Sequence, residues 1–165
     1  MNSIRLALTA AILVGLALSA GCSSKAPPLP SLANEAVSES RWSAALTSGG
    51  ESIPLTIIAL IAPDLGQTRL VALSAFGVTL GDCRLEKGRN PCRSAPGADG
   101  LMKRISTAFG EMLRQDASFL LEAGSDSARL TGSGWQAERD SSGKIEYRRT
   151  KAAIWTLSLK RLPGK

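Results

Sequence analysis

Cysteine is the residue type whose spacing most directly suggests chemistry in this chain, because histidine is absent from all 165 residues. Cys83 and Cys92 stand close together in the stretch LGDCRLEKGRNPCRS. Two thiols without histidine make a poor zinc site, and their separation is far from the C-x-x-C redox spacing. In an oxidising compartment they are expected to form a disulfide that closes a loop of about ten residues. A redox-active pair is the alternative.

Motifs for catalysis are missing from the sequence, which contains no G-x-S-x-G, no glycine-rich phosphate loop and no H-E-x-x-H. The usual serine triad is excluded by the lack of histidine, and no motif marks a serine–lysine dyad. Two carboxylate pairs, Asp64 with Asp82 and Glu138 with Asp140, fall in expected turns and hairpins, where solvated acids are normal. The sequence therefore predicts a protein that is not an enzyme, with no catalytic residue, metal site or cofactor.

The first residues have the layout of a secretory signal. Arg5 supplies a cation, an uncharged apolar run follows, and the small residues Ser19, Ala20 and Gly21 come next. The run is shorter than the roughly 18 residues that span a bilayer. Small residues directly before Cys22 resemble the lipobox of bacterial lipoproteins, in which the cysteine is acylated and the preceding peptide bond is cut. An ordinary exported protein with a chance cysteine is the alternative.

The lipobox resemblance implies a mature chain anchored to a membrane through acyl chains on Cys22. Lipoproteins that lack an aspartate directly after the acylated cysteine are usually sent to the outer membrane. This chain has Ser23 at that position, so we expect it to be anchored in the outer membrane and to face the periplasm. The proline-rich stretch SSKAPPLPSLA predicts an extended tether. The predicted organisation is a signal peptide over residues 1–21, the acylated cysteine and tether over 22–38, and one domain over 39–165.

The charge balance is mildly positive, with 20 basic and 14 acidic residues. Cations gather near the C-terminal end, at Arg148, Arg149, Lys151, Lys160, Arg161 and Lys165. Such a surface suits anionic lipid headgroups, and a solvated sheet face is the alternative. Nucleic acid is not an expected partner, because export separates the chain from it and the few aromatic residues form no stacking platform among the cations.

The first half of the domain shows the period of two that is typical of strands. In residues 42–47, the side chains of Trp42, Ala44 and Leu46 alternate with those of Ser43, Ala45 and Thr47. Gly49-Gly50 then supplies a hairpin turn, and the returning stretch SIPLTIIALIA carries apolar residues on both faces. A strand of that kind is covered on both faces or faces a ligand. A turn at residues 63–66 follows, and TRLVALSAFGVTLGDCRLEKG predicts two more strands joined at Phe76-Gly77. These strands predict an antiparallel meander.

A helix is expected next, over residues 100–115, with Asp99 as its N-cap. Its apolar stripe is Leu101, Met102, Ile105, Ala108, Phe109, Met112 and Leu113, which packs on the sheet as core or forms a lid over a cavity. SFLLEA predicts a short strand. The stretches ARLTGSGWQAERD and GKIEYRRT predict a hairpin through Ser141-Ser142-Gly143, and the run from Ala153 onward predicts a closing strand. The expected fold is α+β: a curved antiparallel sheet, or incomplete β-barrel, with one main amphipathic helix packed on or in it.

A wider resemblance rests on the lipobox, the proline spacer, the stretch RLVALSAFGVTLGDCRLEKG, a helix midway and the closing run GSGWQAERDSSGKIEYRRTKAAIWTLSLKRL. The combination resembles the LolA/LolB-like lipoprotein-carrier superfamily, and in particular outer-membrane lipoproteins of the DUF3261 type. The resemblance implies an incomplete barrel around a helical lid, with an apolar interior that receives acyl chains.

These observations predict an outer-membrane lipoprotein that binds or transfers a hydrophobic acyl-chain ligand without catalysis. Burial of twelve methylenes, at roughly 0.8 kcal/mol each, would contribute about 10 kcal/mol before the entropic costs of binding. The candidate lining residues are Leu55, Ile57, Leu73, Phe109, Met112, Trp155 and Leu157. The alternative is an anchored module without an internal ligand that docks an envelope protein through an exposed sheet edge and the basic C-terminal strand.

Overall fold

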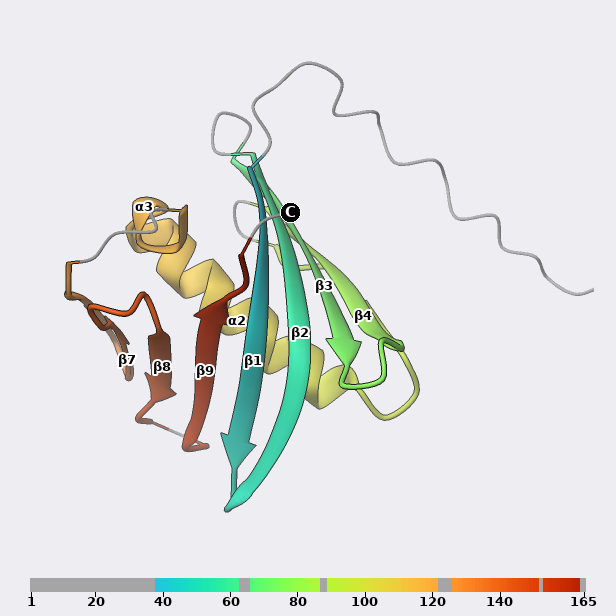
Figure 1. The fold of residues 1–165 in the computed structure, drawn as a ribbon. Helices are drawn as coiled ribbons and strands as arrows, with labels where there is room; N and C mark the ends of the chain where they lie inside the picture. Colours follow the sequence, from blue (N-terminus) through green and yellow to red (C-terminus); the bar gives the residue numbers. More distant parts are fainter. Residues whose placement is uncertain (1–37, 63–65, 87–88, 122–125, 152, 164–165) are drawn as a thin grey trace, which may run out of the picture. The chain divides into compact units, whose positions relative to one another are not determined.

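The computed structural model describes residues 38–62, 66–86, 89–121, 126–151 and 153–163 (Figure 1). The predicted signal peptide, Cys22 and nearly all of the predicted tether lie outside these residues. Within them, nine antiparallel strands form one sheet in the order β5-β4-β3-β2-β1-β9-β8-β7-β6. β5 and β6 are its two edges, so the sheet is not closed. Its strands are curved (Figure 1). The predicted α+β class, an open antiparallel sheet with one main helix, is confirmed.

The N-terminal meander begins with a long hairpin. β1 (Ser38–Ser48) pairs with β2 (Glu51–Ala62) from Ser48 opposite Glu51 onward. Gly49 and Gly50 between them have φ angles of 60° and 86°, which glycine adopts without steric cost. The predicted hairpin is therefore confirmed.

Three further strands extend this meander to one edge of the sheet. They are β3 (Gln67–Ser74), β4 (Thr79–Leu85) and β5 (Cys92–Ser94). The turn at Phe76-Gly77 lies where the sequence predicts it, with Gly77 at φ 78°. Cys83 and Cys92 stand opposite each other on β4 and β5 and are joined by the predicted disulfide. Most of the turn predicted before β3, at residues 63–65, lies outside the described residues.

The main helix, α2 (Asp99–Gln115), runs across one face of the sheet (Figure 1). Its N-cap is Ala98 rather than the predicted Asp99, and no side chain caps the first turn. Asp99 is instead the first helical residue, where a carboxylate is favourable beside the positive end of the helix dipole. Met102, Ile105, Phe109 and Met112 have no exposed surface. The predicted stripe thus packs on the sheet as core.

The stretch SFLLEA begins as a short helix, α3 (Ser118–Leu121), and the prediction of a strand was wrong. Asp116 explains the difference, because its Oδ1 accepts hydrogen bonds from the backbone nitrogen and the hydroxyl of Ser118. Capping of this kind favours a helical turn. Phe119 and Leu120 are both buried, whereas a strand would place neighbours on opposite faces.

The C-terminal meander contains four strands: β6 (Ala128–Gly132), β7 (Trp135–Arg139), β8 (Ile145–Arg149) and β9 (Trp155–Arg161). The stretch ARLTGSGWQAERD, expected as one strand, is a hairpin of two that turns at Ser133-Gly134, where Gly134 has a φ of 83°. The predicted hairpin through residues 141–143 joins β7 to β8 and is confirmed. The closing strand starts at Trp155 rather than at the predicted Ala153, which is exposed outside it.

β9 pairs with β1 and so joins the two meanders in the middle of the sheet, with Leu157 opposite Leu46. The core lies between the α2 side of the sheet and the helices. It includes Trp42, Leu46, Ile57, Leu70 and Tyr147, all at most 2% exposed. No described helix is long and apolar enough to cross a membrane.

Candidate functional site

The structure separates the predicted lining residues into two groups. Six of them are at most 6% exposed and belong to the packed core, namely Leu55, Ile57, Phe109, Met112, Trp155 and Leu157. Leu73 is half-buried on the opposite face of the sheet, next to Ala72, which points into the core. None of the seven lines the pocket described next.

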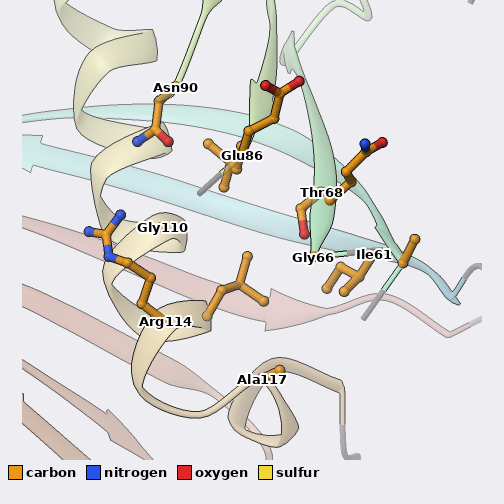
Figure 2. Close-up of a pocket in the computed structure, with 12 residues that line it drawn as sticks. Ile61, Gly66, Thr68, Glu86, Asn90, Gly110, Arg114 and Ala117 are labelled. Atoms are coloured by element: carbon orange, nitrogen blue, oxygen red, sulfur yellow. The ribbon is translucent and has the colours of Figure 1, made fainter. Parts of the chain in front are cut away.

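That pocket, of about 260 Å³, lies where the C-terminal half of α2 faces the ends of β2, β3 and β4 (Figure 2). It is lined by Ile61, Ala62, Gly66, Gln67, Thr68, Leu85, Glu86, Asn90, Gly110, Leu113, Arg114 and Ala117. Ile61 and Leu85 of its lining also belong to the packed core, so the pocket lies at the margin of that core.

The apolar floor of the pocket follows from strand register. Ile61 stands opposite Thr68, and Thr68 stands opposite Leu85, so the three form a row across β2, β3 and β4. All three side chains are at most 6% exposed. Leu113 and Ala117 face this row from the helical side. The result is an aliphatic slot between sheet and helix.

The polar rim is made by Arg114, Asn90 and Glu86. Glu86 forms an ion pair with Arg84 at 3.8 Å. Arg114 has no ion pair with any described carboxylate and is exposed at the last turn of α2. The rim therefore carries one cationic group that the rest of the described domain does not neutralise.

A second cluster of ionisable groups lies on the inner face of β8. The Tyr147 hydroxyl donates a hydrogen bond to Glu111 of α2, and Arg149 Nη1 donates to the same carboxylate at 2.6 Å. Tyr147 is stacked between Trp135 and Trp155, with ring centroids 5.5 and 5.1 Å away. Burial, and then the hydrogen bond to Glu111, raise the pKa of Tyr147 above its usual value. Tyr147 is thus a neutral donor that ties the helix to the sheet.

The predicted carboxylate pairs are engaged in the framework where the structure describes them. Asp82 accepts from Arg69 at 3.0 Å, and Glu138 pairs with Arg129 at 2.6 Å. Asp140 accepts from Ser142 in a turn, and that hydrogen bond lowers the pKa of Asp140. Asp64 lies outside the described residues, which contain no group of three or more side chains suited to a metal ion.

The C-terminal cations do not form one free basic face. Arg148 pairs with Glu146, and Arg149 pairs with Glu111. Arg161 donates to the carbonyl oxygen of Leu121 at 2.7 Å. Lys151 and Lys160 are exposed, and Lys165 lies outside the described residues.

An apolar tip forms at the turn between β3 and β4, where Phe76 is 94% exposed and Val78 is 62% exposed. The Ser74 hydroxyl accepts hydrogen bonds from the backbone nitrogens of both residues, at 3.3 and 3.1 Å. Large apolar side chains are therefore held in solvent by an ordered turn.

Sequence reasoning missed the pocket and its rim. Arg114 and Asn90 belong to no motif, and their proximity depends on the fold. Gly110 is the local sequence signal that could have indicated the pocket. Glycine inside a helix destabilises it by about 1 kcal/mol relative to alanine, so a glycine at this position suggests a packing or functional role.

A scan against protein-family models and a search of curated proteins found no match for this chain.

Proposed function

We propose that the chain is an outer-membrane lipoprotein, anchored through Cys22, that binds a hydrophobic acyl-chain ligand without catalysis. The observation that carries this proposal is the aliphatic slot of Ile61, Leu85 and Leu113, which lies at the margin of the packed core. The sequence resemblance to LolA/LolB-like carriers supports the same class of ligand.

The size of the pocket sets the scale of binding. A volume of 260 Å³ accommodates roughly eight or nine groups that each take the liquid-volume share of a water molecule, about 30 Å³. Burial of eight methylenes at roughly 0.8 kcal/mol each contributes about 6 kcal/mol before the entropic costs of association. A short acyl chain, or the end of a longer one, is held without any catalytic group.

Metabolic labelling with palmitate tests the anchor. We expect label and membrane association in the wild-type chain, and neither in Cys22→Ser. Cys92→Ser is the matched control, because it removes another cysteine and should keep the label. Label that persists in Cys22→Ser would contradict the anchor.

Mass spectrometry of organic extracts tests the ligand, on protein that starts at Ser23 and so lacks acyl chains of its own. We expect co-purified lipid in the parent and its loss in Leu113→Glu, which places a charge in the slot. Leu73→Glu is the matched control, because Leu73 is also half-buried but lies on the opposite face. A folded parent that carries no lipid and takes up no fatty acyl probe would sink the proposal.

The exposed tip at Phe76 and Val78 favours a second function, docking of an envelope protein. Contiguous exposed apolar patches mark protein–protein contacts, and aromatic residues supply much of the binding energy at such contacts. Cross-linking in cells from a photoreactive residue at position 76 should capture a discrete protein in that case. Lys103, which is exposed on α2, provides a control position, and equal products from both positions would argue against docking.

A further inference from the structure

Two hydrogen-bond donors converge on one small space above Gly110. A Cβ atom built at Gly110 would lie 3.3 Å from Nδ2 of Asn90 and 3.5 Å from a terminal guanidinium nitrogen of Arg114. Figure 2 shows the two side chains on either side of Gly110, at the edge of the pocket. A bound oxygen atom cannot take that point itself, which is one bond length from the Gly110 Cα, but an oxygen that rests against the glycine from the same side would lie beside both donors.

Glycine is the residue that leaves this space open. Gly110 lies within α2, is buried, and has no positive φ angle that would require glycine. Alanine would be the better residue for the helix. A side chain at position 110 would press against Asn90 and Arg114, so glycine keeps the approach to these two donors open.

The charge at the rim favours an anion. Arg114 has no ion pair among the described carboxylates, whereas Glu86, the acid of the rim, pairs with Arg84 at 3.8 Å. Figure 2 shows the Glu86 carboxylate directed away from Arg114 and Asn90. A planar guanidinium beside an amide nitrogen matches the two oxygens of a carboxylate.

We propose that the pocket binds a fatty carboxylate, with its head group above Gly110 between Arg114 and Asn90 and its alkyl chain in the slot of Ile61, Leu85 and Leu113. This inference rests on the proposed function and names the ligand class of the same pocket. The volume limits the buried part of the chain to roughly eight carbons. Affinity should therefore rise about fourfold per methylene up to that length and then level off.

Photolabelling of the full-length chain in its membrane tests the head group. The probes are decanoic acid and decanol, each with the same diazirine near the methyl end, and mass spectrometry locates the adducts. We expect both probes to label the slot, with the acid labelling at roughly tenfold or more lower concentration, because a hydrogen-bonded charged group contributes about 1.5–3 kcal/mol.

Arg114→Gln should remove that preference and leave decanol labelling unchanged. Lys103→Gln is the matched control, because Lys103 is an exposed cation on the same helix that does not line the pocket. Equal labelling by acid and alcohol, or an acid preference that survives in Arg114→Gln, would overturn the inference. Decyl phosphate that displaces the acid probe tenfold better than decanoate would also overturn it.

Gly110→Ala separates the head-group role from a structural one. The added methyl group occupies the space of the carboxylate, so labelling by the acid should fall toward that by the alcohol. The melting temperature should stay unchanged or rise, because alanine favours the helix. A folded Gly110→Ala variant with unchanged acid preference would contradict the geometry. Failure of both probes to label the slot would instead refute the proposed function itself.

Discussion

Arg149 on β8 donates a hydrogen bond to Glu111 on α2, with 2.6 Å between Nη1 and Oε1. The same carboxylate accepts a hydrogen bond from the hydroxyl of Tyr147, so Glu111 of the helix binds two side chains of β8. The side chains of Arg149 and Glu111 are only 27% and 16% exposed. The contact therefore joins the C-terminal meander to the helix in a partly dry environment.

Loss of this carboxylate should destabilise the domain. Glu111→Gln leaves Arg149 without its counter-charge and weakens the hydrogen bond to Tyr147, which should lower the free energy of unfolding by about 1.5–3 kcal/mol. Glu146→Gln is the matched control, because the exposed pair of Glu146 with Arg148 should contribute no more than about 1 kcal/mol. Urea unfolding measures both variants, and equal losses would contradict the special role of Glu111.

The single tyrosine of the chain should make stability depend on alkaline pH. Burial and Glu111 raise the pKa of Tyr147 above its ordinary value of 10.0. The folded state therefore holds the phenolic proton more tightly than the unfolded state. This contribution to stability is complete below pH 10 and is lost as pH rises beyond it.

Ultraviolet titration of tyrosinate tests that dependence directly, because it reports Tyr147 alone. The native protein should ionise at higher pH than the urea-unfolded chain, and Tyr147→Phe should show a weaker decline of stability above pH 10. Identical titration curves for the folded and unfolded chains would refute the prediction.

Reduction of the Cys83–Cys92 disulfide should lower stability without unfolding the sheet. The two residues are nine positions apart, and closure of so short a loop contributes about 2–3 kcal/mol in the chain-entropy model. Thermal unfolding with and without reductant, in a Cys22→Ser background, measures the effect. A double variant, Cys83→Ala with Cys92→Ala, should then be insensitive to reductant.

Close packing of α2 on β4 should make Gly81 intolerant of a side chain. A Cβ atom there would lie 2.5 Å from Cγ of Met102 and 2.9 Å from the carbonyl oxygen of Arg93. Gly81→Ala should therefore cost about 1–3 kcal/mol of stability through overpacking. Gly100→Ala is the control, because nothing lies within 4 Å of its Cβ and alanine favours the helix. Similar melting temperatures for the two variants would contradict this packing.

The hairpins and the main helix were predictable because their signals are local. Gly49-Gly50 and the alternation of neighbouring residues determine one turn and its two strands, and the apolar stripe of α2 has the helical period. The prediction of a strand at residues 118–123 was wrong because the apolar run alone does not take account of the hydrogen bond by which Asp116 caps the helical turn. Capping and burial of both Phe119 and Leu120 outweighed the apolar run.

The pocket could not be predicted in the same way, because it depends on long-range register. Ile61 and Leu85 meet only through Thr68 of the strand between them, and Leu113 reaches them from the helix. Six of the seven predicted lining residues lie in the packed core, whereas Leu73 lies on the opposite face of the sheet. The pocket lies instead at the margin of that core.

The pairing of β1 with β9 has a consequence for the order of folding. The first and last strands of the sheet are neighbours, so its central seam closes only after residues 155–161 have been synthesised. Until then β1 presents an unpaired backbone edge, of the kind that recruits other chains into aggregates. Such late, non-local closure slows folding. A chain truncated anywhere before β9 would keep that seam open permanently.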